Sequence, residues 1–321
     1  MKVLVSDNLH QTGVELFEAE ADIDVDVKTG LDPKALKGII GQYHGLVIRS
    51  ATKVNADLLE AADSLKVIGR AGIGLDNVDI PAATARGIVV MNTPGGNTVS
   101  AAEHAIAMML SLTRNIPRGT ATLKQGLWEK KQLQGREVFK KTLGVIGCGN
   151  IGSIVADRAR GLKMKVIVHD PCFTSELIEE MGHESVSLEE LYARSDYITV
   201  HVPKDESTSN MIDKTAFAQM KDGVMLINCS RGGIVEENDL YAALTSGKVA
   251  GAAMDVFREE PPGDHPLLKL DQFIATPHLG ASTQEAQINV AVAVARQMIA
   301  YLKEGKAINA VNEDSACACR T

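Results

Sequence analysis

The apolar residues of this chain follow two alternating patterns. Short, nearly continuous apolar runs are typical of strands buried in a parallel sheet, and longer stretches with apolar residues three or four positions apart are typical of helices. The chain passes from one pattern to the other along most of its length. This order predicts an α/β fold with doubly wound parallel sheets and helices on both faces.

The elements can be placed by residue number. The predicted strands lie at 2–6, 23–27, 45–48, 67–68, 88–91, 143–146, 164–168, 197–202, 224–228, 249–256 and 273–275. The predicted helices lie at 9–18, 35–37, 55–62, 98–112, 151–161, 187–193, 214–220, 236–246 and 282–304. The segment 116–141 is less regular and contains Trp128. It is expected to be either an arm that packs on another subunit or a solvated surface loop.

Two of the predicted helices are long and rich in small apolar residues, and they suggest how the chain is divided. The helix at 98–112 is interpreted as the crossover into a second domain, and the helix at 282–304 as the return. A chain of 321 residues is long enough for two cores. We predict a discontinuous domain formed by 1–97 and 288–321, and a continuous domain formed by 98–287.

Composition and charge exclude several classes. The 45% hydrophobic and 23% charged content is that of an ordinary soluble protein, and the net charge of -8 argues against nucleic-acid binding. No signal peptide or apolar run of membrane-spanning length is found, so no membrane partner is expected. The five cysteines are unpatterned, which favours reduced thiols and a cytoplasmic location. Cys317 and Cys319 are too few for a zinc site, so no metal is expected, and the tail from Asn312 is expected to be disordered.

One motif predicts a cofactor. Gly147, Gly149 and Gly152 form a G-x-G-x-x-G turn between a predicted strand and a predicted helix, and Asp170 closes the next strand. Such a turn brings the backbone close to a pyrophosphate, and the acid accepts hydrogen bonds from ribose hydroxyls. The carboxylate would repel a 2′-phosphate, and 171–173 contains no cation to replace it, so NAD rather than NADP is expected.

Three further residues suggest catalysis. Arg231, Glu260 and His278 stand in the contexts NCSRGGIVEE, DVFREEPP and TPHLGAST. A histidine can accept a hydroxyl proton near neutral pH, a carboxylate beside it favours its charged form, and an arginine offers a fork to a substrate carboxylate. Each residue alone would more often have a structural role, and it is their joint occurrence that favours catalysis.

Together with GCGNIG, these segments resemble the D-isomer-specific 2-hydroxyacid dehydrogenases over nearly the whole chain. RSATKV, GRAGIGLDNVD, MNTPGGNTVSAAEHAIAMML and INAVN are similar to the phosphoglycerate dehydrogenase branch of that family. The resemblance implies two Rossmann-like domains, a flavodoxin-like substrate domain and an NAD-binding Rossmann domain. It also implies NAD-dependent oxidation of D-3-phosphoglycerate to 3-phosphohydroxypyruvate, a step of serine biosynthesis, by a homodimer or homotetramer.

The resemblance also implies roles for individual residues. Arg231, Glu260 and His278 would be the catalytic residues, with His278 as the base. The cofactor would contact Gly147, Gly149, Asn150, Ile151, Gly152, Asp170, Pro203, Cys229, Ser230, Arg231, Asp255, His278, Gly280 and Ala281. The substrate, a phosphorylated 2-hydroxy acid, would contact Arg49, Ser50, Arg70, Gly72, Asn97, Arg231 and His278.

Some alternatives stay open at this point. A glyoxylate or hydroxypyruvate reductase, or another D-2-hydroxyacid dehydrogenase, would share the motifs, and an NAD-sensing corepressor would share the fold. A formate dehydrogenase is disfavoured because Glu260 stands where that enzyme would use an amide. Ile73 replaces a threonine that often contacts the cofactor in relatives. The sequence ends at Thr321, whereas longer relatives continue into serine-binding domains, so feedback inhibition by serine is not expected.

Overall fold

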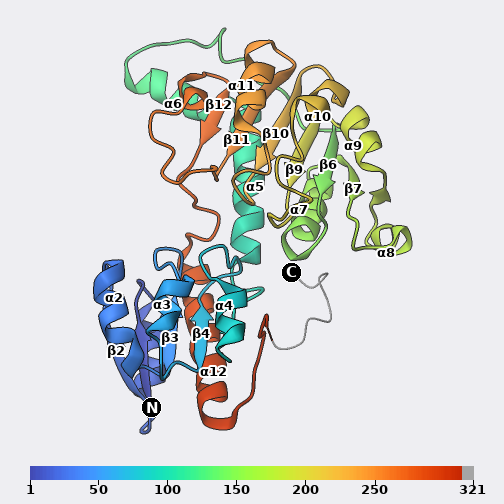
Figure 1. Cartoon of the computed structure of the whole chain (residues 1–321). Helices are drawn as coiled ribbons and strands as arrows, with labels where there is room; N and C mark the ends of the chain where they lie inside the picture. Colours follow the sequence, from blue (N-terminus) through green and yellow to red (C-terminus); the bar gives the residue numbers. More distant parts are fainter. Residues whose placement is uncertain (313–321) are drawn as a thin grey trace. The chain divides into compact units, whose positions relative to one another are not determined.

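The structure is a computed structural model that describes residues 1–312. The tail was expected to be disordered from Asn312, but Asn312 is held in place, since its side chain accepts a hydrogen bond from Val90 and donates to Thr84 and Ile88. The expectations for the rest of the tail, including Cys317 and Cys319, lie outside the described residues. The chain divides into two compact units (Figure 1). Unit 1 comprises Met1–Thr98 and the described residues from Ala281 onward, and unit 2 comprises Val99–Gly280. The divisions predicted from the sequence lie after residues 97 and 287.

Unit 1 is built on a five-stranded sheet in the order β2-β1-β3-β4-β5, and every pairing is parallel. This 2-1-3-4-5 order is the flavodoxin-like one. The strands are β1 (Lys2–Val5), β2 (Asp24–Val27), β3 (Gly45–Ile48), β4 (Val67–Arg70) and β5 (Val89–Met91). The helices are α1 (Gln11–Glu18), α2 (Pro33–Ile39), the 3₁₀ turn η1 (Ile40–Gln42), α3 (Ala56–Glu60), α4 (Ile80–Ala85) and α12 (Gln284–Glu304).

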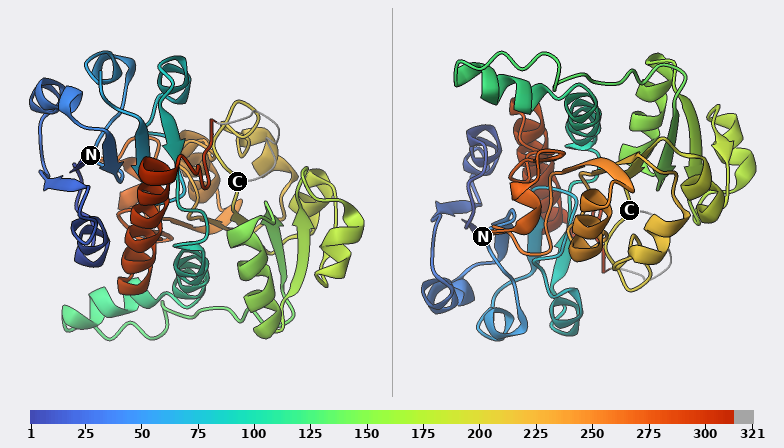
Figure 2. Two further views of the ribbon diagram at one scale, coloured as in Figure 1. Left: turned by 90° about the horizontal axis from the view of Figure 1, so that it is seen from below. Right: turned by 90° about the horizontal axis from the view of Figure 1, so that it is seen from above.

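Each face of this sheet has its own core because successive side chains of a strand point to opposite faces. Val3 and Val5 pack with Phe17 of α1 and Val294 of α12, whereas Leu4 packs in the cluster formed by α2, α3 and α4. Figure 2 shows α1 and α12 on one side of the sheet and the other three helices on the opposite side. The return of the chain as α12 is therefore essential to the core of unit 1.

Unit 2 contains a seven-stranded sheet in the order β12-β11-β10-β9-β6-β7-β8, again wholly parallel. Counted from β6, this is the Rossmann order extended by one strand. The strands are β6 (Thr142–Ile146), β7 (Lys165–His169), β8 (Glu184–Ser185), β9 (Tyr197–Val200), β10 (Val224–Asn228), β11 (Val249–Met254) and β12 (Phe273–Ala275). The helices are α5 (Thr98–Thr113), α6 (Ile116–Lys124), α7 (Asn150–Gly161), α8 (Ser175–Glu180), α9 (Leu188–Arg194), α10 (Lys214–Gln219), α11 (Glu237–Thr245) and the 3₁₀ turn η2 (Pro266–Lys269).

Two apolar clusters cover the faces of this second sheet. One joins the sheet to α5 and α7 through residues such as Met109 and Val155. The other joins it to α9, α10 and α11 through Leu191, Phe217 and Leu240. The strand order reverses between β6 and β9, so the carboxyl ends of these two strands form the crevice in which such sheets bind ligands.

The predicted strands and long helices are confirmed, and the differences concern short elements. The sequence analysis missed α4, α8 and the two-residue strand β8. A signal for α4 was present, because Asp79 caps the helix through its side chain and a proline stands in the first turn. The segment expected to be irregular begins with the helix α6, none of whose residues is buried.

Candidate active site

The glycine-rich turn between β6 and α7 has the close contacts that its glycines allow. Gly147 has a φ of 89°, and a Cβ there would lie 2.7 Å from the carbonyl oxygen of His201. A Cβ on Gly152 would lie 1.9 Å from the carbonyl oxygen of Gly147. The helix begins after Gly149, and no side chain caps it. The first N–H groups of α7 are therefore available to a phosphate, which the helix dipole also favours.

Asp170 follows β7 and holds the same turn. Its Oδ2 atom accepts a hydrogen bond from the backbone N–H of Cys148 at 2.6 Å, and its Oδ1 atom accepts one from Cys172 at 2.8 Å. A carboxylate oxygen can accept more than one bond, so acceptor capacity remains for ribose hydroxyls. These two features fit a dinucleotide, with the pyrophosphate at the start of α7 and the adenosine ribose at Asp170.

His201 belongs to this region and was not singled out from the sequence. It follows β9, and its Nε2 atom lies 2.9 Å from the hydroxyl of Thr199. Burial lowers the pKa of His201 to about 4, so the ring is neutral at physiological pH. The only available signal was its position at the carboxyl end of a strand.

The residues predicted to be catalytic are centred on a hydrogen-bonded pair, His278 and Glu260. The Nδ1 atom of His278 lies 2.7 Å from Oε2 of Glu260, and both side chains are partly exposed, at 48% and 39%. The other carboxylate oxygen of Glu260 accepts a bond from the backbone N–H of Phe257 at 3.1 Å. The carboxylate is thus fixed on one side by the backbone and on the other by the imidazole.

The hydrogen bond between His278 and Glu260 shifts the pKa of both groups. The hydrogen bond to Glu260 raises the pKa of His278, against the opposing effect of burial. The charge of Asp255 also raises this pKa, while that of Arg231 lowers it. Burial alone would raise the pKa of Glu260, but the hydrogen bonds from His278 and Phe257 outweigh it and the pKa is lowered. The pair therefore favours a charged imidazole beside a carboxylate, with the Nε2 atom of the ring left for another partner.

The loop that carries His278 is organised by Asp255, which is 1% exposed. Its carboxylate accepts hydrogen bonds from the backbone N–H groups of Leu279 at 2.7 Å and Gly280 at 2.8 Å, and from the hydroxyl of Thr276 at 2.6 Å. The Nε2 atom of His104, on α5, lies 3.2 Å from the same carboxylate. Asp255 was expected to contact the cofactor, and in the structure its oxygens accept hydrogen bonds from these groups of the protein. His104 was not identified from the sequence.

Arg231 follows β10 in a turn stabilised by Asn228. The side-chain amide of Asn228 donates to the carbonyl of Arg231 at 2.9 Å, and its oxygen accepts from the backbone N–H of Ser230 at 3.1 Å. The guanidinium of Arg231 donates to the carbonyl of Ser230 at 2.7 Å. Burial raises the pKa of the neighbouring Cys229, so this thiol stays protonated. The side chain of Arg231 is thereby oriented by the backbone of its own turn.

In unit 1, the residues expected to bind substrate follow strands at a second point where the strand order reverses. Asp7 follows β1, and its carboxylate accepts hydrogen bonds from the backbone N–H groups of Arg49 at 2.6 Å and Thr52 at 3.1 Å. The guanidinium of Arg49 donates to the carbonyl of Asn8 at 3.0 Å, and burial lowers the pKa of this group. Ser50 is exposed next to it.

Asn77, which the sequence analysis missed, connects two of these residues. Its amide donates to the carbonyl of Arg49 at 2.8 Å, and its oxygen accepts from Nε of Arg70 at 3.2 Å. Gly72 has a φ of 149°, and its N–H donates to Thr93 at 2.8 Å. Arg49, Ser50, Arg70 and Gly72 are thus gathered at the carboxyl ends of β3 and β4.

The structure also places other residues that were predicted to bind the cofactor or the substrate. Asn150 and Ile151 lie in the first turn of α7. The carbonyl of Pro203 accepts a hydrogen bond from Thr208, and Ala281 belongs to unit 1. The buried Oδ1 atom of Asn97 has no hydrogen-bond partner.

The described part of the chain offers neither a metal site nor a membrane-spanning helix. Within residues 1–312, no three histidine, cysteine or acidic side chains are grouped so that they could hold a metal ion. In the same range, no helix combines the length and apolarity needed to cross a membrane.

Known proteins are similar to this chain over most of its length. Residues 106–280 match the family described as D-isomer specific 2-hydroxyacid dehydrogenase, NAD binding domain. The chain is 48% identical to D-3-phosphoglycerate dehydrogenases from Synechocystis sp. and from Archaeoglobus fulgidus, in each case over 97% of its own length. It spans 56% and 59% of the lengths of these relatives.

A solved structure is also similar. The D-lactate dehydrogenase from Aquifex aeolicus, complexed with NAD and lactic acid, is 29% identical and has a TM-score of 0.86, with 98% of this chain and all of that chain covered. The family match extends over more than half of the chain and includes the glycine-rich turn, Asp170, Arg231, Glu260 and His278. The chain belongs to the D-isomer specific 2-hydroxyacid dehydrogenase family and contains its NAD-binding domain.

Proposed function

We propose that this protein oxidises D-3-phosphoglycerate to 3-phosphohydroxypyruvate with NAD as the acceptor. The reaction removes a hydroxyl proton and a hydride from the same secondary alcohol. NAD supplies the hydride acceptor when it is bound. The chain's own residues must hold the acid, accept the proton and position the carbon that loses the hydride.

The hydrogen bond between His278 and Glu260 carries this proposal. Nδ1 of His278 is engaged by Glu260, so Nε2 is the atom that accepts the hydroxyl proton from the substrate. The imidazolium formed is stabilised by the carboxylate beside it, which lowers the cost of proton transfer. In the reverse direction the same nitrogen returns the proton to the keto oxygen.

Arg231 is proposed to bind the substrate carboxylate. Guanidinium and carboxylate groups match in shape and can form two parallel hydrogen bonds, which fix the orientation of the acid as well as its position. The charge of Arg231 also lowers the pKa of His278, which favours the neutral base that oxidation requires.

The phosphate group is assigned to Arg49, with Arg70 as a second cation. The support is the position of both residues at the carboxyl ends of neighbouring strands and the identity with the two D-3-phosphoglycerate dehydrogenases. Arg49 uses one N–H for Asn8, so further donors remain for a phosphate.

The test is a comparison of 2-hydroxy acids with and without a phosphate group, each measured as kcat/KM with NAD. Arg49→Ala should reduce the value for D-3-phosphoglycerate about a hundredfold and that for an unphosphorylated acid only slightly. Arg86→Ala removes a surface arginine of the same unit and is the matched control. Equal losses on both acids would assign Arg49 a structural role, and a preference for glyoxylate or hydroxypyruvate in the reductive direction would replace the proposed substrate.

We also propose that the enzyme is a cytoplasmic homodimer or homotetramer that uses residues 116–128 of the arm at 116–141 as an interface. These residues expose Ile116 at 52%, Leu123 at 58%, Leu127 at 47% and Trp128 at 82%. So many large apolar side chains on one segment are typical of a surface that is covered in the assembled protein. The cytoplasmic location is supported by the free cysteines Cys148 and Cys229.

A further inference from the structure

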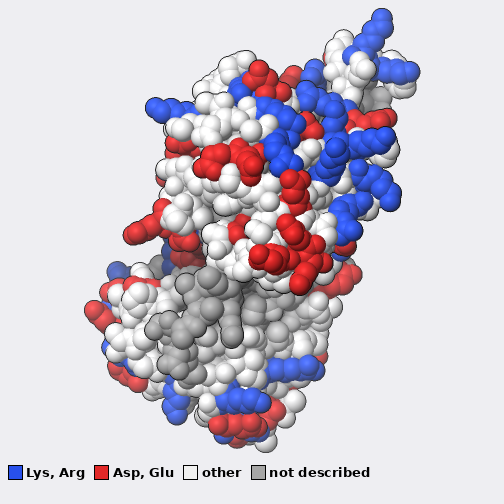
Figure 3. Space-filling model, turned by 90° about the vertical axis from the view of Figure 1, so that its right-hand side faces the viewer, with Lys and Arg blue, Asp and Glu red and all other residues white. Residues whose placement is uncertain are grey.

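A depression of about 1080 Å³ on unit 2 is lined mainly by cations, and the proposed reaction does not use it. Its charged residues are Lys140, Arg158, Arg160, Lys163 and Lys165, with Asp157 as the only acid among the lining residues. We call these five cations the basic cluster. Figure 3 shows Lys and Arg side chains gathered on one side of this unit, although the chain as a whole carries a net charge of -8.

The basic cluster is distinct from the dinucleotide turn. Lys140 precedes β6 and Lys165 begins β7, whereas Gly147 and Asp170 follow the opposite ends of these strands. A strand advances roughly 3.3 Å per residue, so the length of a five-residue strand separates the two edges of the sheet. A ligand in the depression would therefore leave the glycine-rich turn accessible.

Two lysines of the cluster have a backbone conformation that lysine rarely adopts. Lys140 and Lys163 both have a φ of 61°, in the left-handed region where glycine or asparagine is favoured. The N–H of Lys140 donates to the carbonyl of Lys163 at 3.1 Å, so the two residues are held together. Lys163 lies just beyond the end of α7, where a left-handed residue closes the helix and glycine is usual. Lysine at two hydrogen-bonded positions that favour glycine suggests that the positive charges have a function.

Among the described residues, three lysines of the basic cluster form no ion pair, although the charge of Lys165 acts on Glu184. Arg158 is paired with Glu103 at 3.1 Å, and Arg160 donates to the carbonyl of Met181 at 3.2 Å. Within residues 1–312, no carboxylate lies within ion-pair distance of the ammonium groups of Lys140, Lys163 or Lys165. Three unpaired cations and the remaining donors of Arg160 therefore face solvent around one depression.

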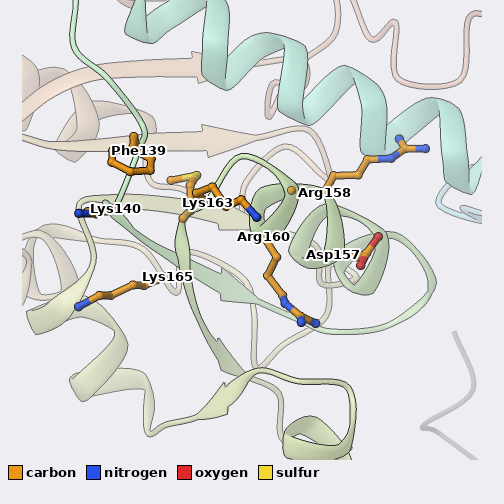
Figure 4. Close-up of a pocket in the computed structure, with 9 residues that line it drawn as sticks. Phe139, Lys140, Asp157, Arg158, Arg160, Lys163 and Lys165 are labelled. Carbon is orange, nitrogen blue, oxygen red and sulfur yellow. The ribbon is translucent and has the colours of Figure 1, made fainter.

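The arrangement of the side chains indicates the kind of anion. Figure 4 shows the charged ends spread across the surface, with Lys140 and Lys165 on one side and Arg160 and Arg158 on the other. A single phosphate could contact only part of the cluster, whereas a chain of linked phosphates could contact several cations at once. The ring of Phe139, 51% exposed, lies beside Lys140 with the ammonium group 5.0 Å from its centre. An exposed ring next to cations also fits a nucleotide base.

We propose that the basic cluster binds a small oligophosphate, either inorganic or carried by a nucleotide. The phosphates contact Lys140, Lys163, Lys165 and Arg160, and a base, where the ligand has one, packs on Phe139. This proposal is independent of the substrate assigned above because it concerns the opposite edge of the sheet.

The test is isothermal titration of the full chain with saturating NAD, so that the dinucleotide site is already filled. Inorganic tripolyphosphate, ATP and orthophosphate are the probes, at low and at physiological ionic strength. We expect tripolyphosphate to bind more tightly than orthophosphate. The double variant Lys140→Gly/Lys163→Gly should weaken its binding at least about tenfold, without lowering the Tm of the unliganded protein, since glycine suits both conformations.

A second variant and a control complete the design. Lys165→Ala leaves both left-handed positions intact and should also weaken binding, whereas Lys34→Ala, which removes an exposed lysine of α2, should not. If ATP binds more tightly than tripolyphosphate, and Phe139→Ala removes this difference, the ligand is a nucleotide. Equal affinities of the wild type for ATP and tripolyphosphate identify an inorganic oligophosphate. Unchanged affinity in both the double variant and Lys165→Ala, or no binding by the wild type at low ionic strength, would overturn the proposal.

Discussion

The Nδ1 atom of His278 lies 2.7 Å from Oε2 of Glu260, which joins the loop after β12 to the loop after β11. This hydrogen bond is the largest influence that raises the pKa of His278. Oxidation requires the neutral ring, so its rate should rise with pH through this pKa, and reduction should fall through the same region.

Glu260→Gln should shift the oxidative profile toward lower pH. The amide cannot stabilise the charged ring as a carboxylate does, so the pKa of His278 falls and the neutral base is present at lower pH. The measurement is kcat/KM against pH for the wild type and the variant, with NAD affinity determined separately. His278→Ala should remove most turnover and provides the reference for background. A profile at the wild-type position would mean that Glu260 does not set the protonation of His278.

The contact between His104 and Asp255 gives a second prediction. Asp255 is almost fully buried, and burial alone would raise its pKa, but the hydrogen bonds from His104, Thr276 and the backbone lower it. His104→Ala removes one of these partners and should lower the free energy of unfolding by about 1–3 kcal/mol. The activity should also fall, because the carboxylate holds the loop that carries His278.

His104→Gln is the matched variant, since its amide can still donate to Asp255. It should recover most of the stability and activity lost in His104→Ala, as measured by urea unfolding and by kcat. Similar losses in both variants would show that the size or ring of His104, rather than its hydrogen bond, matters.

Features that depend on residues close together in the sequence could be predicted, whereas contacts between distant residues could not. The parallel strands are contiguous apolar runs, and the glycine-rich turn, with Asp170 after the next strand, lies within one βαβ unit. Both could be predicted because their determinants are local. The short helix α8, of six residues, has too few turns for a clear apolar period and was missed.

Contacts between distant residues could not be read from the pattern. His104 and Thr276 are 172 positions apart, and their side chains lie 3.0 Å from each other only because α5 packs on the sheet. For the same reason, the hydrogen bonds that occupy Asp255 were not foreseen. The left-handed conformations of Lys140 and Lys163 were also hidden, because lysine is not the residue that usually signals such a turn.

Gly232 gives a prediction about the backbone next to the hydrogen-bonded pair of His278 and Glu260. A Cβ at this position would lie 1.8 Å from the carbonyl oxygen of Phe257 and 2.7 Å from the nitrogen of Arg258. Gly232→Ala must therefore displace the segment in which the N–H of Phe257 donates to Glu260, and we expect kcat to fall about a hundredfold. Gly161→Ala places a methyl group in open space at the end of α7 and should leave kcat unchanged. Near-normal kcat in Gly232→Ala would show that the segment moves without disturbing the pair.

The position of Asp170 predicts the choice of cofactor. Its carboxylate is held by two backbone N–H groups, so it cannot easily turn away from a 2′-phosphate. The residues that follow, Pro171, Cys172 and Phe173, offer no cation. NAD should therefore be preferred over NADP by at least about a hundredfold in kcat/KM. Asp170→Asn should reduce the preference for NAD, chiefly because kcat/KM with NAD falls. Similar values of kcat/KM for NAD and NADP in the wild type would contradict the assignment.

The last prediction concerns Trp128, the single tryptophan of the chain, whose side chain is 82% exposed in the isolated subunit. If residues 116–128 form the proposed interface, the ring of Trp128 is buried in the assembled protein, and its emission should shift to longer wavelength as the protein is diluted. The mass from light scattering should fall over the same concentration range. Trp128→Ser should raise the dissociation constant of the assembly at least about tenfold, because buried aromatic side chains contribute much of the binding energy of an interface. Tyr241→Ser, which changes an exposed aromatic residue of α11, should leave the assembly unchanged. A monomeric mass at micromolar concentration, with emission typical of a solvated ring throughout, would require that the interface be withdrawn.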